Sequence, residues 1–310
     1  MYCRGCFAVA RCNRALVLVS SISRPTSTSA RPPTSATPNE CSGGSTCTVR
    51  NCCPAVRAIA IFEALSAFDD SFVAEAGFRS EDRKGKSQSK EYRDAYVRQI
   101  IGGKPAEKDK AQGNGARRFE DAFVRALKAV SAWLQAPNSD ANEDYPSKGK
   151  DAEGHAVHAT IPRLFETSLL LEVIHVFLGN TNVRDWVAHA ETYLAILDLL
   201  RWMLDASTAI SLLRAPIRRI EATSGLRRAV WGDGNVRFED IGGAAFDPAA
   251  PAPGRERTRS LCDLIKNLEA HRRPLMALAS KATFEATVDK VNSLCDGILY
   301  LLLQQVVDEI

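Results

Sequence analysis

Five arginines lie close together in the C-terminal half of the chain, where they could bind an anionic partner. They are Arg214, Arg218, Arg219, Arg227 and Arg228. Arg214 and Arg218 are one turn apart on a helix, a spacing that would let them clamp a phosphate group or an acidic protein surface. Trp231 is the one aromatic residue nearby, and Glu221 reduces the local charge. The alternative is a solvated face, or pairing with acidic residues of neighbouring helices, which is the usual situation of surface charge.

A second group with chemical potential is Glu153, His155 and His158, which lie within a polar stretch. Two histidines three residues apart can share one face of a helix and bind a metal. A structural zinc site takes four ligands, however, and no cysteine lies near these residues in the sequence. We interpret them as solvated loop residues. We therefore expect no metal and no cofactor, and we assign no catalytic residue.

Cysteines are concentrated at the N-terminus. Seven of the nine lie in the first 53 residues: Cys3, Cys6, Cys12, Cys41, Cys47, Cys52 and Cys53. An odd number in a Ser/Thr/Pro-rich segment is not typical of a disulfide scaffold, and the regular paired spacing of a zinc module is missing. Cys262 and Cys295 lie on apolar faces of predicted helices, where buried free thiols are common. We interpret the folded part as reduced and intracellular, in the cytoplasm or the nucleus.

Net charge is uneven along the chain. Residues 1–53 contain six Arg, one Glu and no Lys, so most of the positive charge lies there and the remaining residues sum to about neutral. A nearly neutral folded part argues against a general nucleic-acid binder. No run reaches the roughly 20 apolar residues that a membrane span requires. We therefore expect protein partners, with neither nucleic acid nor a membrane span.

The N-terminal leader has three interpretations. Residues 1–39 contain five Arg, many Ser and Thr, and no acidic residue, a composition typical of a mitochondrial or plastid transit peptide. The same composition fits a disordered low-complexity tail. A third possibility is that this segment is not native coding sequence. The first interpretation would place the protein in the mitochondrion.

The centre of the predicted fold is residues 162–205, two strongly apolar helices joined by a Gly-Asn-Thr-Asn turn. Leu170, Val173, Ile174 and Phe177 recur at the spacing of one helix face. Gly179 is a stop signal, and Asn182 can cap the second helix, which carries an apolar seam from Trp186 to Leu204. Such a pair must be buried by other helices.

Helical patterns before and after this pair supply the rest of a bundle. They span residues 54–77, 89–101, 116–135, 209–222, 226–231, 258–282 and 284–308, with a short strand near 235–238. Pro274 predicts a kink in the penultimate helix. The fold class is all-α, an irregular helical bundle with a disordered N-terminal leader. The predicted organisation is a leader (1–53), a helical segment (54–135), a polar linker (136–160) and a helical bundle (161–310).

Three short motifs and a tryptophan follow one another between residues 72 and 186. Phe-Val-Ala-Glu-Ala-Gly-Phe at 72–78 is followed by Ser-Lys-Glu-Tyr at 89–92, and further on by Glu-Val-Ile-His at 172–175 and Trp186. This order resembles the C-terminal flank of the large, apollon-type E2 ubiquitin-conjugating enzymes, over about residues 58–190. The motif positions are Phe72, Glu75, Gly77, Phe78, Ser89 and Tyr92. The resemblance implies helices that flank an E2 core. A sharp turn at Gly77 would support it, and a helix that continues through Gly77 would count against it.

The catalytic half of such an enzyme has no counterpart in the sequence. An E2 needs an accessible nucleophilic Cys and an Asn that stabilises the oxyanion. The chain has no His-Pro-Asn element, and Cys52 and Cys53 stand at about half the family's distance from Phe72. The leading hypothesis is therefore an E2-related fragment or decayed paralogue that has no transfer activity of its own and binds proteins of the ubiquitin system. The alternatives are a helical scaffold or adaptor unrelated to ubiquitin, and an active E2 that uses Cys52 or Cys53.

Overall fold

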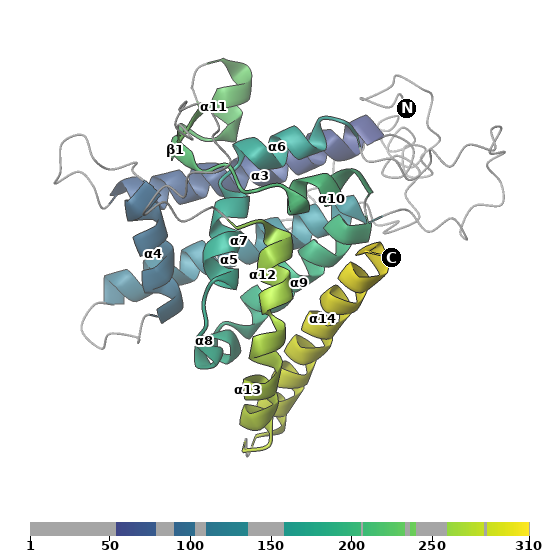
Figure 1. Cartoon of the computed structure of the whole chain (residues 1–310). Coiled ribbons are helices and arrows are strands. Elements are labelled where there is room, and N and C mark those ends of the chain that lie inside the picture. The colour runs from purple at the N-terminus through teal and green to yellow at the C-terminus, as the bar shows by residue number, and fades with distance from the viewer. Residues whose placement is uncertain are drawn as a thin grey trace, which may run out of the picture.

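Two long helices pack along each other in the N-terminal half of the fold. The computed structural model describes residues 54–78, 90–102, 110–135, 158–205, 207–232, 236–239, 259–281 and 284–309. Within these ranges α3 (Pro54–Phe78) packs along α5 (Lys110–Leu134), and α5 in turn packs on α9 (Ala190–Asp205) (Figure 1). Helix α5 begins six residues before the predicted start at Ala116. The predicted leader, most of the polar linker, Glu153, His155 and Ser89 lie outside the described residues.

The contact between α3 and α5 is aromatic. Phe72 of α3 lies 5.2 Å from Phe119 of α5 between ring centroids, and Phe68 lies 5.4 Å from Phe123. Phe123 extends this stack to Phe177 at 5.3 Å. All five rings are almost completely buried. Their burial, worth roughly 1.5–3 kcal/mol for each side chain, joins the N-terminal helices to the central ones in one core.

The central pair is broken into four helices. The first predicted helix becomes α6 (Ile161–Thr167) and α7 (Leu170–Leu178), and the second becomes α8 (Val183–Ala188) and α9. The turn between the two pairs is as predicted: α7 ends at Gly179, and the Asn182 side chain accepts a hydrogen bond from the Arg184 N–H at 3.2 Å. The breaks at Ser168 and His189 were not predicted, because side chains from distant helices hold the chain there.

The segment after α9 is less helical than predicted. Helix α10 (Ser207–Arg214) ends before Pro216, which has no N–H to continue a helix. Strand β1 (Ile220–Ala222) follows, so the predicted helix over 209–222 is wrong in its second half. β1 pairs antiparallel with β2 (Arg237–Phe238), which confirms the predicted short strand, and α11 (Leu226–Trp231) lies between them and packs on α3.

The chain closes with three helices. α12 (Leu261–Asn267) and α13 (Glu269–Ala279) are separated at Leu268, not at Pro274, which lies inside α13 without ending it. α14 (Glu285–Glu309) packs against α13 and along α9. In Figure 1 it forms one edge of the molecule, and its last turns reach back toward α10.

The all-α prediction is confirmed, since the two short strands are the one sheet in the described part of the chain. α4 (Lys90–Gly102) packs against α7 and β1 and is fastened there by Arg93, which hydrogen-bonds Glu172 and the Ile220 carbonyl. Residues from both predicted helical segments, 54–135 and 161–310, belong to a single hydrophobic core. Among the described helices, none is both long and apolar enough to cross a membrane.

Candidate functional site

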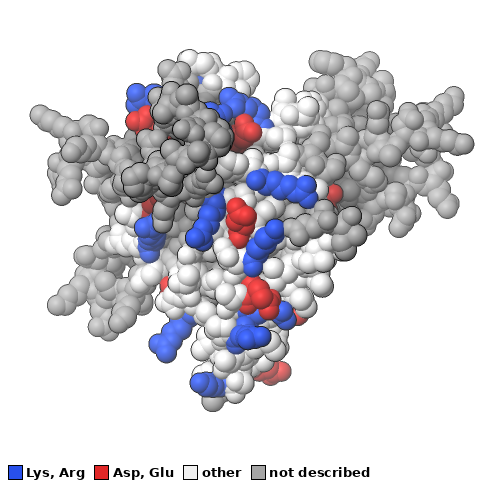
Figure 2. Space-filling model, viewed as in Figure 1, with Lys and Arg blue, Asp and Glu red and all other residues white. Residues whose placement is uncertain are grey.

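The five candidate arginines do not form one surface. Arg227 pairs with two carboxylates of α3, at 2.7 Å to Glu63 and 3.6 Å to Asp70. Arg218 stacks on the ring of Phe238 at 4.3 Å. Arg228 is exposed on α11. Figure 2 shows the basic side chains of this face in separate groups, with acidic side chains between them. Arg227 therefore pairs with acidic residues of a neighbouring helix, as one of the two predictions for this cluster stated.

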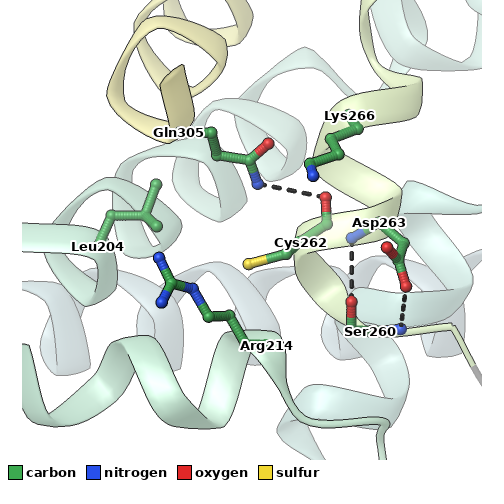
Figure 3. A pocket seen from close by; sticks show the side chains of 7 residues that line it. All are labelled: Leu204, Arg214, Ser260, Cys262, Asp263, Lys266 and Gln305. Atoms are coloured by element: carbon green, nitrogen blue, oxygen red, sulfur yellow. Dashed lines mark hydrogen bonds between the residues drawn. The ribbon is translucent and has the colours of Figure 1, made fainter. Parts of the chain in front are cut away.

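Arg214 takes a different position, at the edge of a pocket between α9, α10, α12 and α14. The volume of this pocket is about 400 Å³, within the range of small-molecule sites. We call it the α10–α12 pocket. Its lining, drawn in Figure 3, consists of Leu204, Arg214, Ser260, Cys262, Asp263, Lys266 and Gln305.

Hydrogen bonds at the start of α12 shape one wall of the α10–α12 pocket. The Ser260 hydroxyl accepts from the Asp263 N–H at 3.1 Å, and the Asp263 carboxylate accepts from the Ser260 N–H at 3.1 Å. This reciprocal cap fixes where the helix begins. The hydrogen bonds with Ser260 lower the pKa of Asp263, which therefore stays ionised. In Figure 3 its carboxylate points away from the Cys262 thiol.

The opposite wall comes from α14. Gln305 is 7% exposed, and its amide nitrogen donates to the Cys262 carbonyl at 3.2 Å, which ties α14 to α12. Its amide oxygen is buried and has no hydrogen-bond partner in the described part of the chain. Figure 3 shows the Cys262 thiol directed toward the Arg214 guanidinium, whereas the Gln305 amide oxygen lies on the side of Lys266.

Electrostatics in the pocket make Cys262 a poor nucleophile. Burial raises the pKa of its thiol, while the charges of Arg214 and Lys266 act in the opposite direction without cancelling the effect. The thiol is therefore neutral near pH 7, and a neutral thiol is neither a nucleophile nor a metal ligand. Cys262 is half-buried at the pocket, whereas Cys295 is buried as predicted. The lining thus carries two basic side chains, Arg214 and Lys266, and one carboxylate, Asp263.

The second candidate surface is the end of α14. Leu303, Val306 and Val307 are 57%, 56% and 66% exposed, and their spacing places them on one face of the helix. We call these three residues the α14 strip. The outward residues of the first half of the helix, such as Asp289 and Asp296, are polar and exposed. Apart from Phe284, which precedes the first turn and is 75% exposed, the strongly exposed apolar residues of this segment lie in the C-terminal turns.

The described residues of the E2-like motifs lie within helices, and some of them are buried in the hydrophobic core. Phe72 is buried in the aromatic core, and α3 continues as a helix through Gly77 to Phe78, so the sharp turn at Gly77 is not present. Tyr92 lies in the first turn of α4. Trp186 is buried and donates to the Asn180 carbonyl at 2.9 Å. Glu75 lies near the end of α3 and is partly exposed.

Sequence reasoning missed Lys266, Cys262 and Gln305 as parts of one site with Arg214. They lie on α12 and α14, far from Arg214 in sequence, and no local spacing connects them. The described residues contain no group of three His, Cys, Asp or Glu side chains placed to hold a metal. His158 hydrogen-bonds with the Thr160 hydroxyl at 2.8 Å.

Comparisons with protein-family models, with curated proteins and with solved structures found no match to this chain.

Proposed function

We propose that this chain is a helical scaffold or adaptor that acts by binding another protein, and that the α14 strip is its contact surface. The observation that supports the proposal is the exposure of Leu303, Val306 and Val307 on one helix face. Aliphatic side chains that are more than half exposed lose the free energy that burial would provide, about 25 cal/mol for each Å². A partner that covers the strip recovers that free energy.

The strip has the spacing of a helix-recognition surface. Partners that dock on an amphipathic helix contact residues at i, i+3 and i+4, which is the relation among these three positions. A stable interface buries about 800 Å² on each side, more than three aliphatic side chains supply. The partner must therefore also contact the polar surface around the strip. This requirement favours a different protein over symmetric pairing of two strips.

A narrower version of the proposal places the partner in the ubiquitin system, as an E2-related chain would. The helix through Gly77 gives this version no support, and the scaffold version does not depend on it. Titration of isotope-labelled ubiquitin with the full chain tests it. Saturable shifts that a Leu303→Glu substitution abolishes would favour the narrower version, and unchanged spectra would contradict it.

The scaffold proposal is tested by photocrosslinking in the full chain, expressed in its cells of origin. A photoreactive phenylalanine analogue replaces Leu303 in one variant and Ile59 in the control. Ile59 is an apolar residue of α3 that is 50% exposed and lies outside the strip. We expect one reproducible protein adduct, identified by mass spectrometry, from position 303 and none from position 59. The same adducts from both positions, or none from either, would contradict the proposal.

A further inference from the structure

A groove lies between α8 and α13, at the end of the molecule opposite α11 (Figure 1). We call it the α8–α13 groove. Its volume is about 350 Å³, and its lining includes four apolar residues and two cations: Val183, Pro274, Ala277, Leu278, Arg184 and Lys281. The lining residues from position 274 to 281 recur at i, i+3, i+4 and i+7, so one face of α13 and of the turn after it forms one wall. A groove of this volume can hold a large apolar side chain of a partner.

The two walls of the α8–α13 groove are fixed relative to each other. Trp186 of α8 and His271 of α13 lie 5.0 Å apart between ring centroids, and both are buried. Nε1 of Trp186 donates to the Asn180 carbonyl at 2.9 Å, and Nε2 of His271 lies 3.2 Å from the same oxygen. Because these contacts already hold α8 against α13, a ligand binds without the cost of ordering the walls.

The charge of the α8–α13 groove is positive. Arg184 and Lys281 are exposed, and neither takes part in an ion pair within the described part of the chain. Among the described residues that line the groove there is no carboxylate. The neighbouring Asp185 carboxylate accepts from the Asn180 amide at 3.2 Å. Figure 2 shows basic side chains around the lower end of the molecule, where Figure 1 places α8 and α13. Both cations are therefore available to an acidic ligand.

We propose that the α8–α13 groove binds an acidic peptide segment of another protein. An apolar side chain of the peptide occupies the groove, and carboxylates on either side of it lie beside Arg184 and Lys281. The apolar anchor supplies most of the affinity because it leaves water for a recessed, apolar site. The charge pairs supply orientation and select against basic segments. The groove gives the chain a protein contact separate from the α14 strip, and it does not depend on that strip.

The shape and composition of the groove favour a peptide over a membrane or a nucleic acid. A membrane surface takes up apolar side chains that protrude, whereas the apolar residues here line a hollow between two helices. A single nucleic-acid strand stacks its bases on aromatic side chains, and the described lining contains none. A peptide uses both the apolar lining and the two cations.

Selection from a phage-displayed library of random peptides on the full wild-type chain tests the proposal. We expect the enriched peptides to share a large apolar residue with Asp or Glu on both sides of it. Isothermal titration calorimetry then measures the Kd of the most enriched peptide for the wild type and the variants. Enrichment of no peptide, or of peptides without acidic residues, would overturn the proposal.

Charge reversal and blocking of the groove test where this peptide binds. Arg184→Glu and Lys281→Glu should each raise the Kd by about 5-fold or more, because each replaces an attraction with a repulsion. Arg228→Glu, the same change of charge at an exposed position of α11, should leave it unchanged. Ala277→Phe should raise the Kd by about 10-fold or more, since the ring fills the groove. Its control is Ala67→Phe, at an exposed position of α3.

Hydrogen exchange locates the bound peptide independently of affinity. The peptide should slow amide exchange in residues 183–188 and 275–281, and a Leu303→Glu substitution in the α14 strip should not change its Kd. Slowed exchange in residues 300–309 instead would place the peptide on the α14 strip and overturn the proposal. Groove variants that bind as tightly as their controls would also overturn it. Thermal unfolding of each variant by circular dichroism checks that it is folded.

Discussion

Asp69 is a buried carboxylate where α3 meets α6, α7 and α11. One of its oxygens accepts from the Ser168 hydroxyl at 2.8 Å and from the Leu169 N–H at 3.0 Å, and the other accepts from the Leu226 N–H at 3.2 Å. It therefore caps the break between α6 and α7 and the start of α11 from a position on α3. Burial raises the pKa of Asp69 to about 7, although the three donors favour the ionised form.

Removing this carboxylate should destabilise the protein strongly. Asp69→Ala leaves the backbone N–H groups of Leu169 and Leu226 buried without an acceptor, and we expect a loss of about 2–4 kcal/mol in the free energy of unfolding. Asp70→Ala is the matched control, because Asp70 is half-exposed and pairs with Arg227 at the surface. It should cost about 0–1 kcal/mol. Urea denaturation measures both, and equal losses would contradict the assigned role.

His189 of the α8–α9 junction and Glu120 of α5 form a His–carboxylate pair. Nδ1 of His189 lies 2.6 Å from Oε1 of Glu120, which also accepts from the Thr192 hydroxyl at 2.8 Å. The hydrogen bond to Glu120 raises the pKa of His189 against the opposing effect of burial. Burial acts to raise the pKa of Glu120, but hydrogen bonds from His189 and Thr192 outweigh it and lower that pKa. The pair holds the break between α8 and α9 against α5.

These shifts predict a dependence of stability on pH. The contribution of His189 to the free energy of unfolding is fully present below its ordinary pKa of 6.5. It is lost as the pH rises through the raised pKa. The contribution of Glu120 to the free energy of unfolding is present above its ordinary pKa of 4.5. It is lost as the pH falls through the lowered pKa. The pair is therefore most stabilising between about pH 4.5 and 6.5.

The measurement is urea denaturation of the wild type and of His189→Gln at pH 6 and pH 9. We expect the substitution to cost about 1 kcal/mol more at pH 6 than at pH 9, because the charged pair exists only at the lower pH. His158→Gln is the control, since His158 bonds to a hydroxyl and not to a carboxylate. A cost for His189→Gln that is the same at both values of pH would show that the pair is not ionised in this way.

At the scale of elements, α14 is held against α9 by close approach of its backbone. A Cβ placed on Gly297 would lie 3.0 Å from Cδ1 and 3.5 Å from Cβ of Leu197 on α9. Such distances leave no room for a branched side chain at the point where α14 packs on α9. Glycine is unfavourable inside a helix by about 1 kcal/mol, so packing is the physical reason for its presence.

Gly297→Val should therefore destabilise the protein by about 1–3 kcal/mol through overpacking, although valine is a better helix former than glycine. The control is Asn292→Val, at an exposed position of the same helix, which should change stability by less than about 1 kcal/mol. Thermal unfolding of both variants compares them. A Gly297→Val chain at least as stable as the wild type would mean that α9 and α14 are not in close contact there.

Sequence patterns predicted most helices but not where they break. The apolar spacing of α7 and α9, the stop at Gly179 and the cap at Asn182 are local signals, and each was correct. The break at Ser168 depends on Asp69, which is far away in the sequence, and no local pattern contains that relation. The break between α12 and α13 falls at Leu268, six residues before Pro274, where no local signal predicted it.

At the scale of the whole molecule, the candidate sites arise where elements distant in sequence meet. Arg214 was recognised as a candidate, but its partners in the pocket, Lys266 and Gln305, come from α12 and α14. The exposure of the α14 strip also could not be predicted, because consecutive apolar residues from Ile298 to Leu303 do not mark which side of the helix faces the core. Leu301 is buried in the core, whereas Leu303, two positions later, faces outward.

The proposed function rests on the binding of a protein at the α14 strip. Crosslinking from a photoreactive analogue at Val306 tests it most directly, with the yield of the protein adduct compared among three chains. The first chain carries no further change. The second also carries Leu303→Glu and Val307→Glu, and the third also carries Ile59→Glu. We predict that the paired substitution abolishes the adduct and that Ile59→Glu leaves its yield unchanged, since only the former places charge in an apolar contact. An adduct of equal yield from all three chains would contradict the claim.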